Sequence, residues 1–325
     1  HGPYCSANWA AAVAVLYMSL LAGAAESPVV RPLAPGVLTV IPSAVEEGET
    51  FFGPVGMPEI VAGIANLDWT PNYEPKSSTL QERAKRVVFR RPVWCLEFAF
   101  KPLRMIEVDI PQPAGKMQRK LIWYIVYRVK NTGYDLNPAG STDRWGHTLF
   151  EAEEVNFETR RFFPRFTLRS IEYSKEYSDR VLPSAVRAIQ ERENPGVKLC
   201  NSVEITGVPI PLSDERVDRS VWGVATWEDV DPRMDFFSVF VAGLTNAFRF
   251  EDPPGAYKAG NEPGTGRLYQ AKNLQLNFWR PGDSVLEHER EIRYGVPADP
   301  DPLTQKQLLD RYGVSARLDH LWVYR

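Results

Sequence analysis

This chain of 325 residues has few histidines and cysteines and a small net charge. It contains 4 His and 3 Cys, and its 38 Lys and Arg against 41 Asp and Glu leave a net charge of −3. A general nucleic-acid binder needs a strong basic excess to displace counterions from phosphates, so the composition argues against this class. The densest basic run, from Arg83 to Arg91, is interpreted as a solvated face, with a docking patch as the alternative.

The sequence motifs of the common catalytic machineries are also missing. The chain has no GxSxG, P-loop, HExxH or CxxC pattern, and no GxGxxG that opens a helix. The glycine-rich stretch Gly260–Gly266 lacks the Lys-Ser/Thr pair of a phosphate-binding loop, so we interpret it as a flexible loop. His147, His288 and His320 lie far apart, whereas a zinc site usually takes two ligands from one segment. A non-catalytic role is favoured, and the question of an enzyme stays open.

An apolar run without a charge lies near the beginning of the sequence, from Ala10 to Ala25. An apolar core of about 12 to 16 residues is shorter than the roughly 20 that a membrane-spanning helix needs. The run suits a signal peptide, and Ala22-Gly23-Ala24 supplies the small residues of a cleavage site. Residues 1–9 hold no Lys or Arg, which departs from that pattern, so an uncleaved anchor and a buried helix stay as alternatives. We expect export to the periplasm, cell envelope or exterior, with membrane contact only if the segment is uncleaved.

The cysteines are consistent with export. Cys5 would leave with the signal peptide, which makes Cys95 and Cys200 the disulfide candidate. Closing so long a loop would stabilise the fold by about 4 kcal/mol in the chain-entropy description. The alternative is two buried free thiols, which are common in apolar strands.

Alternating apolar side chains are the strongest structural signal. Trp94, Leu96, Phe98 and Phe100 alternate onto one face, as in a half-buried strand. Residues 121–129 are almost continuously apolar, which is typical of a strand covered on both faces. The sequence predicts a mainly β fold: an antiparallel β-sandwich of one large or two immunoglobulin-like units, with one connecting helix and a short C-terminal helix. The predicted core comprises Trp94, Leu96, Phe98, Trp123, Ile125, Val239, Val241, Leu276 and Phe278.

Composition and periodicity divide the chain into successive segments. Helical spacing appears in residues 178–193 and again near 303–311, and strands are expected at 199–206, 221–227, 235–244 and 274–279. The predicted segments are 1–25, a signal peptide or anchor; 26–86, an extended Pro- and Gly-rich stretch anchored by Leu67 and Trp69; 87–172, a first β unit; 173–198, a helical connector; 199–295, a second β unit; and 296–325, a helix and a docked strand.

Acidic and aromatic residues supply the remaining site candidates. Glu228, Asp229, Asp231 and Asp235 lie in one loop, and alternating oxygen ligands in a loop suit Ca²⁺, although the EF-hand spacing fails. Glu151, Glu153 and Glu154 are interpreted as a solvated strand edge, and His288 as a strand-surface histidine. Residues 145–147 and 278–280 adjoin turns, where exposed rings could stack on sugars, although a buried core is the alternative.

Three runs carry a resemblance: WYIVYRVKNTG (Trp123–Gly133), WEDVDPRMDFFSVFVAGLTNAFRFED (Trp227–Asp252) and RLDHLWVYR (Arg317–Arg325). In these runs the chain resembles uncharacterised exported proteins of planctomycete-type bacteria. The resemblance implies an envelope or periplasmic setting and no catalytic residue. The first run is also similar to strands of bacterial immunoglobulin-like modules.

The sequence thus favours a non-catalytic structural or binding component of the bacterial cell envelope, with envelope proteins or polysaccharide as partners and no nucleic acid. One alternative is a carbohydrate-active hydrolase or sugar-binding module on a β-sandwich. Another is an adhesion module stapled by calcium.

Overall fold

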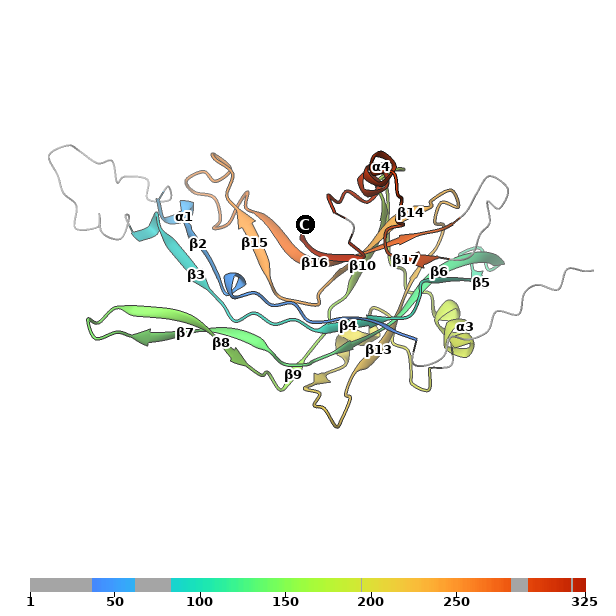
Figure 1. Cartoon of the computed structure of the whole chain (residues 1–325), viewed down its shortest axis with the longest axis horizontal. Helices are drawn as coiled ribbons and strands as arrows, with labels where there is room; N and C mark the ends of the chain where they lie inside the picture. Colours follow the sequence, from blue (N-terminus) through green and yellow to red (C-terminus); the bar gives the residue numbers. More distant parts are fainter. Residues whose placement is uncertain (1–36, 62–82, 194, 282–291, 317) are drawn as a thin grey trace, which may run out of the picture. The chain divides into compact units, whose positions relative to one another are not determined.

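The structure, a computed structural model, describes residues 37–61, 83–193, 195–281, 292–316 and 318–325. They belong to one compact unit of the chain, Leu33–Arg325. They are mainly β, and the sheets are antiparallel (Figure 1). The predicted signal segment, the anchors Leu67 and Trp69, and His288 lie outside the described residues.

The first sheet is built around β6 (Met117–Lys130), the nearly continuous apolar run of the sequence. Its pairing order is β1-β4-β6-β13, and β5 also pairs with β6. The other strands are β1 (Thr39–Ile41), β4 (Glu97–Phe100), β5 (Arg104–Pro111) and β13 (Val221–Trp227).

The second sheet is built around β16 (Leu268–Trp279). Its pairing order is β11-β10-β14-β16-β15, and β17 and β18 also pair with β16. The other strands are β10 (Arg165–Ser170), β11 (Lys175–Ser178), β14 (Phe236–Ala242), β15 (Phe248–Glu251), β17 (Arg293–Tyr294) and β18 (His320–Tyr324). The C-terminal strand is docked, because residues 320–324 pair with residues 276–272.

Three two-stranded ribbons and several short helical turns complete the β structure. The ribbons are β2 (Phe51–Val55) with β3 (Val87–Arg90), β7 (Asp135–Thr142) with β8 (Thr148–Val155), and β9 (Thr159–Arg160) with β12 (Ile210–Pro211). The turns are η1 (Glu47–Glu49), α1 (Pro58–Val61) and η2 (Glu204–Gly207).

Alternating side chains of both sheets meet in one hydrophobic core. Phe98 of β4 stacks on Tyr127 of β6 with 5.5 Å between ring centroids, and Phe237 of β14 stacks on Phe278 of β16 at 5.7 Å. Phe100 joins the sheets by meeting Phe278 edge-on at 6.0 Å. Removing one such ring from water contributes about 1.5–3 kcal/mol. Every predicted core residue belongs to this cluster, with Trp94 at its partly buried margin.

Helices α3 (Pro183–Glu193) and α4 (Pro302–Tyr312) lie against the sheets outside this core. Ala185 and Ile189 of α3 pack against β5, β6 and β13, so the apolar part of β6 from Ile122 onward is covered on both faces, as its sequence predicts. Asp301 caps α4 by accepting a hydrogen bond from the Thr304 amide, and Gly313 ends it in the left-handed conformation. No helix among the described residues has the length and apolar character that crossing a bilayer requires.

Two features differ from the predicted arrangement. The two predicted β units do not separate at residues 173–198, because β13 pairs with β6 and β14 pairs with β10. The strand expected at 199–206 is reduced to a bridge at Cys200 followed by η2. The Asn201 side chain accepts hydrogen bonds from the amides of Val203 and Glu204, which turns the chain out of the sheet.

Candidate functional site

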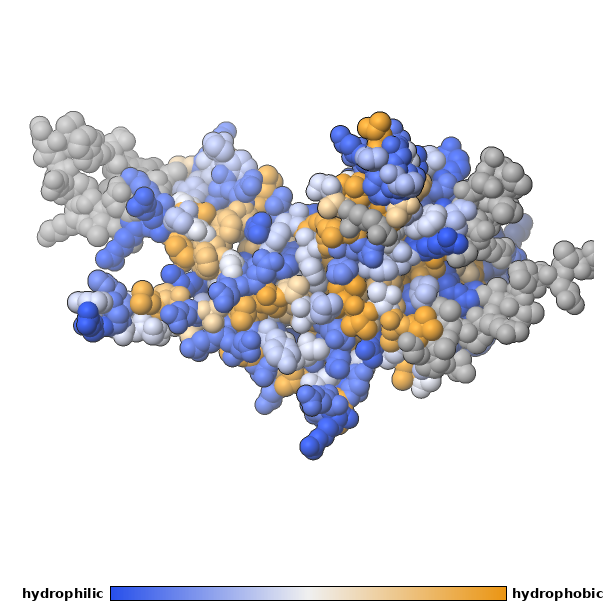
Figure 2. Space-filling model, in the orientation of Figure 1, coloured by the Kyte–Doolittle hydropathy of each residue, from blue (hydrophilic) through white to orange (hydrophobic). Residues whose placement is uncertain are grey.

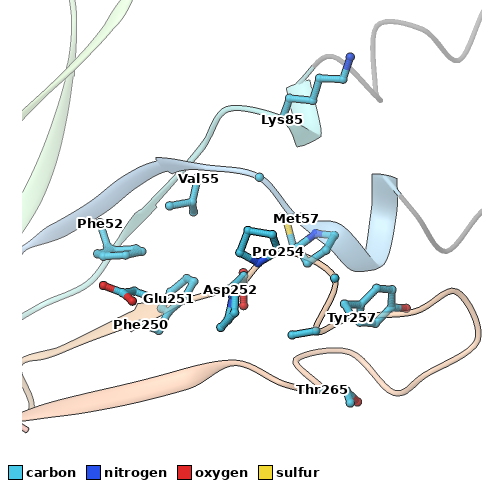
Figure 3. A pocket seen from close by; sticks show the side chains of 15 residues that line it. Phe52, Val55, Met57, Lys85, Phe250, Glu251, Asp252, Pro254, Tyr257 and Thr265 are labelled. Atoms are coloured by element: carbon cyan, nitrogen blue, oxygen red, sulfur yellow. The ribbon is translucent and has the colours of Figure 1, made fainter.

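A pocket of about 820 Å³ opens between the β2–β3 ribbon and the loop that joins β15 to β16. Figure 2 shows hydrophobic side chains gathered in the region of β2 and β15, with hydrophilic ones around them. The lining of the pocket is largely apolar, with aromatic rings from both sides (Figure 3). The apolar side chains include Phe52, Val55, Met57, Phe250, Pro254 and Tyr257.

The first wall is shaped by an irregular strand. The pairing of β2 with β3 shifts between Phe52 and Val55, where the sequence places Gly53 and Pro54. Proline lacks the amide that a sheet ladder needs and is therefore found at edges and bulges. Gly53 has φ of +122°, and an added Cβ would lie 2.5 Å from the Val87 carbonyl oxygen, so this position requires glycine. The chain then turns into Met57, whose amide donates to the Ala84 carbonyl at 2.9 Å.

The second wall is the loop from Asp252 to Arg267, which folds back on itself. Arg267 closes its base with a bidentate ion pair, because Nε and Nη2 lie 2.7 and 3.0 Å from the two carboxylate oxygens of Asp252. At its tip the Tyr257 hydroxyl donates to the Asn261 carbonyl at 3.1 Å. Gly266 packs so closely on Ala256 that an added Cβ would lie 2.6 Å from the alanine Cβ. The stretch interpreted as a flexible loop therefore has a defined fold and contributes Thr265 to the pocket.

Aromatic contacts join the two walls at their base. The ring centroids of Phe52 and Phe250 are 4.4 Å apart, and Phe89 meets Phe250 edge-on at 5.8 Å. The Arg267 guanidinium lies over the Phe250 ring at 4.3 Å and reaches Glu59 of α1 at 3.7 Å. The pocket therefore has an aromatic base closed by these contacts and opens between the β2–β3 ribbon and the β15–β16 loop.

Among the described residues, the charged side chains that line the pocket are those of Lys85, Glu251 and Asp252. Asp252 is held by Arg267, and this carboxylate raises the pKa of the arginine well above its usual range. Glu251 and Lys85 are exposed side chains at the edge of the lining. Most of the other described lining residues are apolar, and Phe250 among them is buried, so the pocket offers an environment for a hydrophobic group.

Of the four carboxylates predicted to bind calcium, Glu228 and Asp229 meet at Lys120, whereas Asp231 and Asp235 pair with other cations. Glu228 pairs with Lys120 and Arg180, Asp229 with Lys120, Asp231 with Lys175 and Arg233, and Asp235 with Arg280. No group of three or more His, Cys, Asp or Glu side chains suited to a metal occurs among the described residues. In the structure these loop carboxylates therefore lie in ion pairs.

Cys95 and Cys200 are free thiols in the structure, not the predicted disulfide. Both are buried, but the backbone of Cys95 forms an isolated β-bridge with Thr245, whereas that of Cys200 forms one with Gly223. Burial raises the pKa of the Cys95 thiol to about 12 and also raises that of Cys200. Both side chains thus correspond to the buried-thiol alternative.

The remaining candidates lie apart from one another. His147 lies in the β7–β8 turn beside Asp143, whereas His320 lies on β18, where Nδ1 is 3.2 Å from the Tyr294 hydroxyl oxygen. Glu151, Glu153 and Glu154 are exposed along β8, as expected of a solvated edge. Trp145 is 67% exposed, whereas Phe278 is fully buried in the core and provides no surface for a sugar.

The apolar pocket escapes prediction because its residues show no periodicity. The lining residues come mainly from two Pro- and Gly-rich segments, 52–58 and 250–265, which are distant from each other in sequence. The signal in those segments is their density of Pro and Gly, which predicts loops and not a pocket. No family model matches the chain, and no curated protein or solved structure is detectably similar to it.

Proposed function

We propose that this chain is a non-catalytic binding component of the bacterial cell envelope, and that it holds an apolar ligand in the pocket between β2–β3 and the β15–β16 loop. The observation that carries the proposal is the pocket itself. Its volume of about 820 Å³ matches that of small-molecule sites, which are usually concave, mostly apolar and largely preformed.

The chemistry of the lining favours binding over catalysis. Glycoside hydrolysis generally uses two carboxyl groups, one of them free to exchange a proton. Asp252 is engaged by two guanidinium nitrogens of Arg267, which leaves Glu251 as the other carboxylate among the described lining residues. Phe52, Met57 and Tyr257 instead offer contact to an aliphatic or aromatic group.

A fluorescent apolar probe tests the proposal directly. N-phenyl-1-naphthylamine is neutral, and its emission rises in an apolar site. We expect the wild-type chain to bind it in a saturable manner, and Met57→Glu to abolish saturable binding by placing a charge in the lining. Leu149→Glu is the matched control, because Leu149 is 53% exposed on β8 and does not line the pocket. Equal binding by both variants would contradict the assignment.

The envelope setting rests on the uncharged run from Ala10 to Ala25. Fused ahead of alkaline phosphatase, which is active only after export, this segment is expected to give activity in intact bacteria. Replacing Leu20 and Leu21 by Arg should abolish that activity, because two charges prevent the run from entering the bilayer. Activity that is absent with the natural segment would remove this part of the proposal.

Sugar binding is a second candidate, favoured by Trp145 in the β7–β8 turn. The Trp145 ring is exposed, and the Arg144 guanidinium lies over it, 3.9 Å from the ring centroid. Aromatic faces of this kind stack on sugar rings. A soluble polysaccharide such as laminarin would then retard the chain in affinity electrophoresis, and Trp145→Ala would remove the retardation. Retardation that persists in Trp145→Ala would exclude this ring as the sugar contact.

The shared core also supports the finer fold interpretation, in which the two sheets form one antiparallel sandwich. Strands from both predicted β units contribute to each sheet, which favours one sandwich over two immunoglobulin-like units. Fragments 87–172 and 199–295 produced separately should then fail to fold, as judged by amide proton dispersion. Independent folding of either fragment would favour two units.

A further inference from the structure

A second pocket, of about 400 Å³, opens between β6 and the loop that follows β13. Its lining differs from that of the apolar pocket because it contains three cationic side chains, those of Arg119, Lys120 and Arg280. Asp229 is the carboxylate among the lining residues, and Leu121 supplies a partly exposed apolar surface.

Arg280 is a buried cation whose hydrogen-bonding capacity is not fully used. Its side chain is 5% exposed, and Nη2 donates to the Pro232 carbonyl at 2.6 Å and to Asp235 at 3.2 Å. Its Nε is buried and has no hydrogen-bond partner in the described part of the chain. A buried guanidinium carries five N–H donors, and leaving them unmatched costs free energy. An acceptor that enters the pocket would therefore find a cation already held in place.

The charges around Arg280 extend this preference to anions. Lys120 projects from β6 and lies 3.2 Å from Glu228 and 2.9 Å from Asp229. The Asp229 side chain is 69% exposed, so its carboxylate can move into water when another anion takes its place beside Lys120. Arg119 lies at the opening, but it is 64% exposed and paired with Glu107 at 2.9 Å, so it adds little net charge and the anion preference rests on Arg280 and Lys120.

We propose that this pocket binds a small organic anion, whose oxyanion meets Arg280 and Lys120 and whose apolar body lies against Leu121. A carboxylate and a phosphate monoester share this chemistry, since both present oxygens to a guanidinium and an ammonium. The site is separate from the apolar pocket, with which it shares no lining residue.

Isothermal titration at low ionic strength with benzoate, phenyl phosphate and neutral benzyl alcohol tests the assignment. We expect one anion to bind with one-to-one stoichiometry and benzyl alcohol not to bind. The comparison of benzoate with phenyl phosphate shows which oxyanion the site prefers. Failure of both anions to bind overturns the proposal.

Four variants locate the site. Lys120→Gln and Arg280→Gln should each weaken anion binding by about tenfold or more, since a hydrogen bond to a charged group is lost. Asp229→Asn should tighten binding several-fold, because it removes the competing carboxylate, and Asn tolerates the positive φ of +57° at this position. Arg233→Gln is the matched control: it removes a charge from the same loop, but Arg233 pairs with Asp231 and does not line the pocket.

Opposite effects of Lys120→Gln and Asp229→Asn are the decisive result, because a general loss of structure would weaken binding in both. If Arg280→Gln fails to fold through loss of its contacts to Pro232 and Asp235, these two variants still decide the matter. Equal weakening by Lys120→Gln and Arg233→Gln would show a response to net charge alone and would overturn the proposal.

Discussion

Lys272→Met should strongly destabilise the fold, because Lys272 forms a buried ion pair with Glu49. The two side chains are 2% and 4% exposed, and Nζ lies 2.5 Å from Oε1 of Glu49. Nζ also donates to the Ala44 carbonyl at 2.9 Å, while Glu49 accepts from the Tyr324 hydroxyl at 2.7 Å. The cluster ties the segment before β2 to β16 and to the C-terminal strand.

The magnitude follows from what the substitution leaves behind. Lys272→Met removes the cation but keeps the Glu49 carboxylate buried, and breaking a buried pair in this way costs about 3–5 kcal/mol. Because both groups are almost fully buried, screening by water does not reduce this figure appreciably. The double variant Lys272→Met, Glu49→Gln also removes the buried negative charge, so it should be less destabilised than Lys272→Met alone.

Urea unfolding followed by tryptophan fluorescence measures these differences from the transition midpoints. Lys198→Met is the control, because Lys198 is 76% exposed and pairs with Glu204 at 3.5 Å; it should change the free energy of unfolding by less than about 1 kcal/mol. A Lys272→Met variant as stable as Lys198→Met, or a double variant less stable than Lys272→Met, would refute the reasoning.

The remaining predictions concern the core, the acid response and the thiols. Phe278→Ala should cost about 3–5 kcal/mol in urea unfolding, because Phe278 is fully buried between the sheets; a loss below 1 kcal/mol would contradict that packing. Ion pairing with Arg233 and Lys175 lowers the pKa of Asp231 below its ordinary 3.8. The ionised Asp231 therefore contributes to the free energy of unfolding above pH 3.8, and this contribution is lost as the pH falls through the lowered pKa. Asp231→Asn should therefore destabilise the chain at pH 7 and progressively less in acid, and an equal loss at both would exclude this cause. Cys95 and Cys200 should both react with Ellman's reagent when the chain is unfolded without reductant. A thiol count that is two lower than the number of cysteines would indicate a disulfide.

Much of the fold is predictable because strand burial follows a simple period. Phe98 and Phe100 alternate onto the core side of β4, and the continuous apolar run of β6 corresponds to burial by the core on one face and α3 on the other. The capping pattern of α4 is equally local, since Asp301 and Gly313 lie at its two ends. These features depend on neighbours in sequence.

Contacts between distant segments are not predictable in this way. Phe52 and Phe250 pack on each other across about two hundred residues of sequence, and neither belongs to a strand with clear alternation. The acidic loop at 228–235 has ligand chemistry suited to calcium, but Lys175 and Arg180 come from elsewhere and neutralise its carboxylates. Long-range pairing decides both the pocket and the ion pairs of the acidic loop.

The position of a bound apolar probe tests the central claim most directly. Intermolecular nuclear Overhauser effects between N-phenyl-1-naphthylamine and the isotope-labelled chain should connect the probe to the rings of Phe52 and Tyr257 and to the Met57 methyl group. Contacts to these three residues from both walls would establish the pocket as the binding site. Contacts confined to the exposed Leu149 and Phe150 of β8, with none to the pocket, would contradict the account.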